Sequence, residues 1–190
     1  DDKYIAVDNE LGIYYIYLLH NFHFQVYGAL FSGQYEPAMR AASQMKATVR
    51  AEYLHAGHAF LVNHLEAFYG MKAHVLIRFG KWQAILDEPL PEDPILFCVT
   101  HAFWQYAKGI AHAVLGNVDE ALKQQRLLRA AVAALPAERI VFQNDSRDIL
   151  AVAEAMLAGE LEYRRENYDV AFPHLREAVD LYDRLNYSEP

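Results

Sequence analysis

The chain has 190 residues, 54% of them apolar, and a net charge of −8 from 25 acidic and 17 basic residues. This length and apolar share predict one compact globular domain or array rather than a disordered chain. The acidic balance and the absence of a Lys/Arg block argue against a nucleic-acid-binding surface, and the single Cys98 excludes a disulfide framework.

Apolar residues recur with the period of an α-helix along most of the chain, and strands have little support. In residues 118–134, for example, Val118, Leu122 and Val132 lie mostly along one face, and Asp119 occupies the first turn, where the helix dipole favours acids. We therefore expect an all-α fold with helices at about 12–31, 35–49, 58–79, 81–86, 95–115, 118–134, 147–165 and 168–185. These helices should pair as four antiparallel hairpins, at about 12–49, 58–86, 95–134 and 147–185, within a single array that covers residues 1–190.

Four segments share one register that starts at a turn. A small or polar residue is followed by any residue, a large apolar residue, two further residues and then a small or apolar residue. The segments are GQYEPAMRAA (33–42), GKWQAIL (80–86), GNVDEALKQQ (116–125) and ENYDVAFPHL (166–175). Each resembles the hinge and second helix of a tetratricopeptide repeat. The four anchors are 47, 36 and 50 residues apart, against about 34 in that family, so the repeats are divergent.

The resemblance extends to small residues on both helices of a hairpin. Gly109 and Gly159 fall where the family places a small residue that lets the second helix approach closely, and Ala38, Ala121 and Ala171 match the small residue of the second helix. The segments HNFHF, RFGKWQAIL and NYSEP together also resemble a broad group of uncharacterised bacterial tetratricopeptide proteins. This similarity implies hairpins stacked in a right-handed superhelix, an α-solenoid.

In that family the first helices line a concave groove that binds proteins or peptides. The resemblance therefore implies a protein- or peptide-binding scaffold rather than an enzyme. Carrying the register back from each turn gives the groove residues His20, His23, Tyr27, His74, Arg78, Phe103, Tyr106, Glu160 and Arg164. We expect substitutions such as His20→Ala with Tyr106→Ala to leave the helices intact, and we expect binding to respond to pH near 6–7, where imidazoles titrate.

An alternative function is a metal-binding or enzymatic helical protein that uses His20, His23, His55 and His58. His20 and His23 share a helix face, and Glu52-x-x-His55 is half of a di-iron carboxylate pattern. A second Glu-x-x-His, a His-Glu-x-x-His, a Gly-x-Ser-x-Gly and a phosphate-binding Gly-rich loop are all missing from the sequence. We therefore expect no metal, no cofactor and no catalytic residues.

The ends of the chain bear on its partners. The first expected helix is apolar all round and the last, VAFPHLREAVDLYDRL, carries apolar residues that need cover, so we expect a homo-oligomer or further helices in a longer chain. The chain does not open with Met, which also suggests a piece of a longer protein and leaves its localisation open. The longest apolar run near the start, residues 13–19, is far too short to span a bilayer, so we expect no membrane partner.

Overall fold

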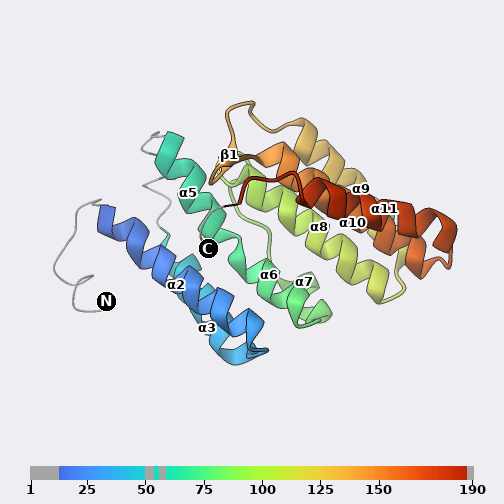
Figure 1. Ribbon diagram of the computed structural model, residues 1–190, viewed down its shortest axis with the longest axis horizontal. Coiled ribbons are helices and arrows are strands. Elements are labelled where there is room, and N and C mark those ends of the chain that lie inside the picture. The colour runs from blue at the N-terminus through green and yellow to red at the C-terminus, as the bar shows by residue number, and fades with distance from the viewer. Residues whose placement is uncertain (1–12, 50–53, 56–58, 188–190) are drawn as a thin grey trace.

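The structure is a computed structural model that describes residues 13–49, 54–55 and 59–187. Within these ranges the chain is mostly helical, which confirms the expected all-α class (Figure 1). The helices are α2 (Ile13–Phe31), α3 (Tyr35–Thr48), α5 (Ala59–Tyr69), α6 (Met71–Arg78), α7 (Trp82–Asp87), α8 (Cys98–Val114), α9 (Val118–Ala133), α10 (Ser146–Arg164) and α11 (Tyr168–Tyr182). Of the helices in this described part, none is long and apolar enough to cross a membrane.

The structure departs from the sequence expectation in two places. The helix expected at 58–79 is interrupted at Gly70, which separates α5 from α6, because glycine is among the weakest helix formers. The break expected after residue 135 contains a two-residue antiparallel pair, β1 (Ile140–Val141) and β2 (Asn144–Asp145). Strands this short carry no alternating pattern that a sequence reading could detect.

The four predicted turns have the same backbone conformation. Gly33, Gly80, Gly116 and Glu166 all have a positive φ, between 62° and 81°. At each turn this residue donates its N–H to the carbonyl three residues earlier, and the next residue donates to the carbonyl five residues earlier. These two bonds form the Schellman motif that ends a helix and redirects the chain. The shared register in the sequence therefore corresponds to a shared local structure.

The small residues allow the two helices of a hairpin to approach each other closely. Ala38, Ala121 and Ala171 are fully buried. A Cβ at Gly159 would lie 2.6 Å from the Leu175 side chain of α11, so the close approach expected there is confirmed. A Cβ at Gly109 would lie 3.4 Å from Gln124 on α9 and 2.7 Å from Leu157 on α10, so this glycine also admits the next hairpin.

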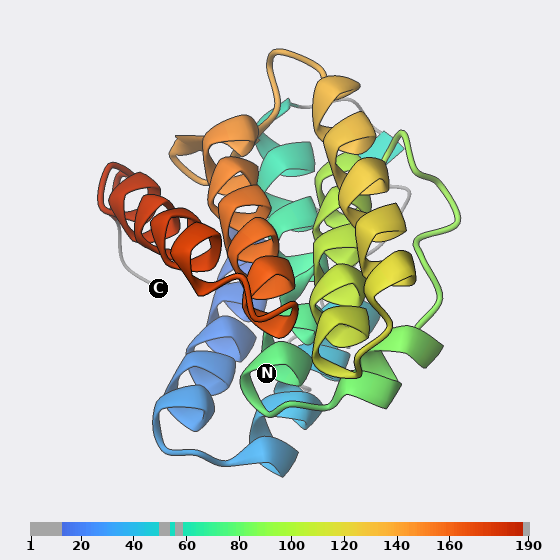
Figure 2. The ribbon, with the colours of Figure 1, turned by 90° about the vertical axis from the view of Figure 1, so that its right-hand side faces the viewer.

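The hairpins α2/α3, α5–α6/α7, α8/α9 and α10/α11 pack in chain order. The first helix of each later hairpin packs against the hairpin before it. In the last pair of hairpins, α10 lies between α8 and α11 (Figure 2). Among the described elements, helices from hairpins that are not neighbours make no contact. The β1–β2 segment, which precedes α10, contacts α5, and its Phe142 ring also lies near His23 of α2. The buried side chains accordingly form successive clusters along the stack rather than one central core.

A buried carboxylate joins the second hairpin to the third. Oε1 of Glu66 on α5 accepts the N–H groups of Val99 and Thr100 at 2.7 and 2.9 Å, in the first turn of α8. Oε2 lies 3.3 Å from Nη1 of Arg139, and Nη2 of Arg139 donates to the Leu96 carbonyl. Burial raises the pKa of Glu66, against the opposing effects of these N–H donors and of the Arg139 charge. Nothing in the sequence pattern had singled out this pair.

Candidate functional site

Histidine and aromatic rings gather on one face of the first helices. His23 of α2 packs its ring edge-on against Phe68 of α5, with the centroids 5.7 Å apart, and Phe142 lies 6.3 Å from His23. His64 of α5 packs against the same Phe142 at 5.7 Å. Phe142 has a φ of 52° at the tip of the β1–β2 turn, so this turn places its ring against α2 and α5. We call these residues, together with His20, His74, Phe103 and Tyr106, the histidine–aromatic face.

The face continues across α6, α8 and α10. His74 of α6 stacks on Phe103 of α8 at 4.3 Å and 22° between planes. Phe103 in turn lies 5.3 Å from Tyr106, and Glu160 of α10 is close enough to Tyr106 to affect its ionisation. Glu160 then binds Arg164 at 2.7 Å. Ring contacts therefore form one group on α2, α5 and Phe142 and a second group on α6 and α8, and electrostatic neighbours link the two groups to each other and to α10.

The environment of this face favours the neutral forms of His23, His74 and Tyr106. Burial lowers the pKa of His23, and the neighbouring His20 adds to the shift. The imidazole of His74 keeps an exposed surface, yet the surrounding protein atoms, with a smaller effect from His23, lower its pKa to about 4. Burial and the Glu160 charge raise the pKa of Tyr106 to about 12.

The structure connects most of the residues expected in the groove. His20, His23, His74, Phe103, Tyr106, Glu160 and Arg164 belong to the two groups just described or to their electrostatic neighbours. Tyr27 lies apart, packed on Phe31 along the exposed side of α2, and Arg78 lies exposed in the last turn of α6. Tyr106 is only 9% exposed and belongs to the core, so Tyr106→Ala would damage the fold, contrary to the expectation for groove residues.

Sequence reasoning missed His64, Phe68 and Phe142. His64 and Phe68 are four residues apart on one helix, a spacing that could have placed them on a common face. Phe142 lies in a segment with no helical register, and only the tertiary structure brings it to α2.

The histidines of the alternative function have different surroundings. His23 packs among aromatic rings, whereas His55 lies near Asp93, whose pKa it helps to lower. Glu52 and His58 lie outside the described residues. Within the described ranges, no group of three or more His, Cys, Asp or Glu side chains is arranged to hold a metal ion.

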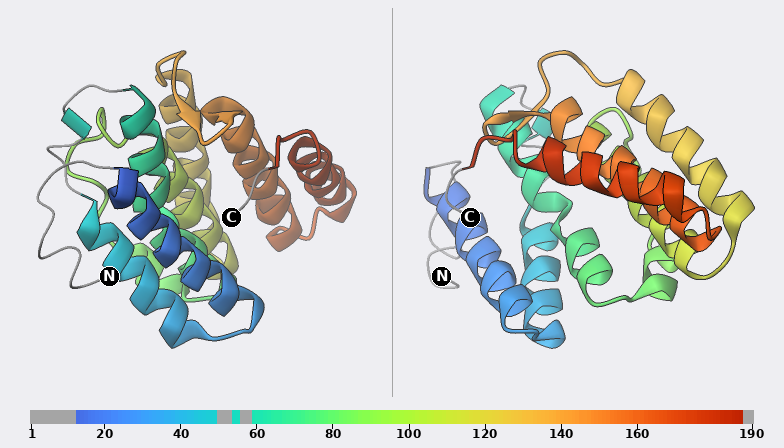
Figure 3. Two further views of the ribbon diagram at one scale, coloured as in Figure 1. Left: turned by 60° about the vertical axis from the view of Figure 1, so that its left-hand side comes forward. Right: turned by 45° about the vertical axis from the view of Figure 1, so that its right-hand side comes forward.

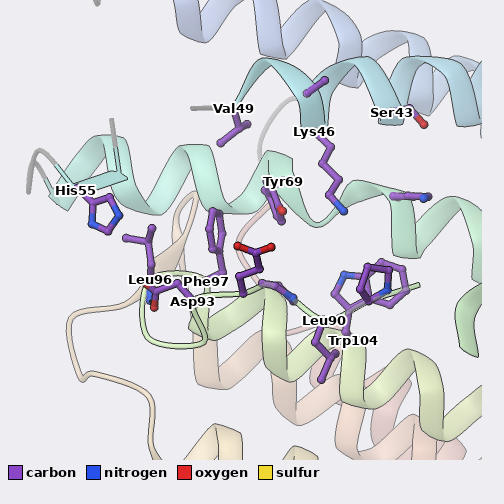
Figure 4. Close-up of a pocket in the computed structure, with 15 residues that line it drawn as sticks. Ser43, Lys46, Val49, His55, Tyr69, Leu90, Asp93, Leu96, Phe97 and Trp104 are labelled. Carbon is purple, nitrogen blue, oxygen red and sulfur yellow. The ribbon is translucent and has the colours of Figure 1, made fainter. Parts of the chain in front are cut away.

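A cavity of about 760 Å³ lies elsewhere, among α3, α6, α8 and the segment after α7 (Figure 4). Lys46 reaches into it from α3, 5.3 Å from the centre of the Tyr69 ring. Lys46 and Lys72 both bind Glu88, at 2.9 Å in the case of Lys46. Burial would raise the pKa of Glu88, but these two lysines outweigh that effect and lower it. One carboxylate therefore bridges both ammonium groups, and the acidic residues Glu92 and Asp93 also line the cavity.

Comparison with protein-family models, with curated proteins and with solved structures finds no match to this chain. The function therefore has to be argued from the geometry of the chain itself.

Proposed function

We propose that the protein is a tetratricopeptide-like scaffold that binds a peptide or helix of another protein on the histidine–aromatic face. The observation that supports this most directly is the run of ring contacts from His74 through Phe103 to Tyr106, with His23 near enough to His74 to affect its ionisation. These residues come from hairpins whose first helices contact one another in sequence. A row of rings on successive first helices is suited to an elongated partner.

The repeat architecture in this proposal is supported by local geometry. The four helix-ending turns share one conformation, small residues occupy the helix–helix contacts, and hairpins contact their neighbours in chain order. These features are typical of an α-solenoid, in which each unit buries its apolar face against adjacent units. We infer the right-handed superhelix on the same grounds.

The chemistry of the face indicates the kind of partner. Aromatic rings provide a large contact area at a low cost in side-chain entropy, and neutral imidazoles can donate and accept hydrogen bonds. Glu160 and Arg164 bind each other, so their charges are compensated before any partner arrives. A segment with apolar or aromatic side chains and an exposed backbone fits such a face better than a highly charged one.

Selection from a random peptide library on the immobilised chain would test the proposal. Selected peptides would be synthesised, and their dissociation constants measured by fluorescence anisotropy. We expect the double variant His23→Ala/His74→Ala to weaken binding at least tenfold. The control Arg40→Ala/Lys123→Ala changes exposed residues on second helices and should bind like the parent. Failure to select any peptide, or equal affinity for the His23/His74 variant, would contradict the proposal.

Elemental analysis distinguishes the scaffold from the alternative, a metal-binding or enzymatic protein that uses His20, His23, His55 and His58. Protein purified without a histidine tag would be analysed for zinc, iron and copper. Stoichiometric metal that is lost in His20→Ala/His23→Ala would support the alternative and overturn the scaffold.

A further inference from the structure

The two terminal helices of the stack, α2 and α11, each carry a stripe of exposed apolar side chains. On α2, Tyr17, Phe24 and Phe31 are exposed and lie seven residues apart, so they share one side of the helix. On α11 the stripe is formed by Tyr168, Phe172, Val179 and Tyr182, which are exposed, and by Leu175, which is half-buried against Gly159 of α10. The two helices do not contact each other within one copy of the chain (Figure 3).

The stripe on α2 corresponds to a packing face elsewhere in the stack. Alignment of the positive-φ turn residues Gly33 and Glu166 places Leu150, Leu157 and Leu161 of α10 at the positions of Tyr17, Phe24 and Gly28. The three leucines are buried at the junction with the preceding hairpin, where Leu157 lies over Gly109. The exposed side of α2 is therefore the side by which a first helix packs on the hairpin before it.

The stripe on α11 corresponds to the surface that receives such a helix. Alignment of Gly116 with Glu166 places α9 residues Val118, Leu122, Gln125, Arg129 and Val132 at the positions of the five α11 residues. Arg129 faces α10, where its Nε lies 3.8 Å from Glu154. Val179, at the position of Arg129, is 58% exposed. The surface of α11 is thus more apolar than the surface of α9, yet Val179 and Tyr182 are 58% and 62% exposed, and Tyr168 and Phe172 stay exposed although the Tyr163 ring of α10 packs on them.

We propose that copies of this chain associate head to tail, with α2 of one copy packed on the α10/α11 hairpin of the next as α10 packs on α8/α9. A second copy fits because one chain carries both halves of the contact. No residue of α2 is charged, so no Asp, Glu, Lys or Arg side chain of this helix would be buried without a partner. A Cβ at Gly28 would meet no atom within 4 Å, which leaves room for close approach.

Such an interface joins two different surfaces, so it does not close on itself as a two-fold dimer does. The expected product is a chain of copies that lengthens with concentration. This inference does not depend on peptide binding, because it is read out as self-association, although the α2 stripe borders the histidine–aromatic face where Phe24 packs on His20 at 4.5 Å.

Sedimentation of the 190-residue chain over a hundredfold range of concentration tests the proposal. We expect the average mass to rise beyond that of a dimer. Phe24→Asp and Val179→Asp each place a charge in one stripe, and each variant alone should be monomeric. Mixed together, they retain one intact pair of surfaces and should form a one-to-one dimer that grows no further. Val170→Asp, an exposed change outside the five-residue stripe of α11, should associate like the parent.

Circular dichroism checks that each variant is folded. If Phe24→Asp does not fold, Gly28→Asp replaces it, because Gly28 lies at the position of the buried Leu161 and a Cβ there meets no atom within 4 Å. A parent chain that stays monomeric throughout would overturn the proposal. So would a Phe24→Asp variant that still dimerises alone, because that result would indicate a symmetric contact between α11 helices.

Discussion

At the residue scale, the closest helix contacts depend on the lack of a side chain at Gly109 and Gly159. The space for a Cβ at Gly159 is limited by the Leu175 side chain and also by the Leu175 backbone nitrogen at 3.1 Å. A side-chain end can rotate away, whereas a helix backbone cannot move without shifting α11. The two glycines therefore set the distances between helices.

We expect Gly109→Leu to destabilise the protein by about 1–3 kcal/mol or more, because the added atoms overpack the contact with Leu157. Gly70→Ala is the control, since its Cβ would lie 3.6 Å from Thr100, an ordinary contact. Thermal unfolding of both variants measures the difference. Equal melting shifts would show that the contact at Gly109 is not tight.

Glu166 offers a second residue-scale prediction, because it is the non-glycine residue among the four left-handed turn positions. The left-handed conformation costs an L-residue about 1–2 kcal/mol. Glycine avoids this strain, but it loses more conformational entropy on folding, so the net gain is smaller. We expect Glu166→Gly to stabilise the protein by about 0.5–1 kcal/mol in urea unfolding. The reverse change, Gly116→Glu, should destabilise it by a similar amount, and opposite signs would disprove the argument.

At the scale of elements, Glu66 connects α5 to the first turn of α8. Its carboxylate satisfies two N–H groups that a helix leaves without partners at its N-terminus, and it also faces Arg139. Because both charged groups are nearly buried, removal of either would leave the other uncompensated.

We expect Glu66→Ala to lower the free energy of unfolding by about 3–5 kcal/mol. The change leaves the Val99 and Thr100 N–H groups without their acceptor and leaves the Arg139 charge without its partner. Glu66→Gln keeps an oxygen for the Val99 and Thr100 N–H groups and should cost clearly less. Urea unfolding monitored by circular dichroism compares the two. An equal loss would mean that the ion pair, rather than the helix cap, accounts for the stability.

At the scale of the whole molecule, the histidine–aromatic face links several hairpins and so couples their stability to pH. The folded pKa values of His23 and His74 are below the ordinary value of 6.5, so the unfolded chain takes up protons first as the pH falls. The contribution of each is therefore complete above pH 6.5 and is lost as the pH falls below that value, for His74 between pH 6.5 and about 4. The response of a bound peptide should lie in this same interval, below the range of pH 6–7 expected from free imidazoles.

We expect the parent chain to lose more stability between pH 7 and pH 4.5 than the variant His74→Gln, which has no imidazole at that position. The raised pKa of Glu66 acts in the opposite direction as the pH falls, but it is common to both proteins and cancels in the comparison. The residues His20, Tyr106 and Glu160 are also the same in the parent and in the His74→Gln variant. Identical pH dependence in parent and variant would contradict the assignment of the shift to His74.

The sequence by itself determined the helices, their pairing into hairpins and the residues at the four turns. These features depend on local periodicity, on residues such as Gly33 and Gly116 that accept a left-handed conformation, and on small residues at fixed distances from the turns. The order of hairpins also placed His23, His74 and Phe103 on successive first helices, where the structure connects them.

Only the tertiary structure decided which side chains meet across distant segments. Phe142 reaches the face from a turn with no periodic signal, and Glu66 meets Arg139 from 73 residues away in the chain. Tyr106 proved to be a core residue because α8 is packed on both sides, a fact that its own spacing does not contain. Periodicity reports which side of a helix is apolar, whereas burial and contact depend on which neighbours cover that side.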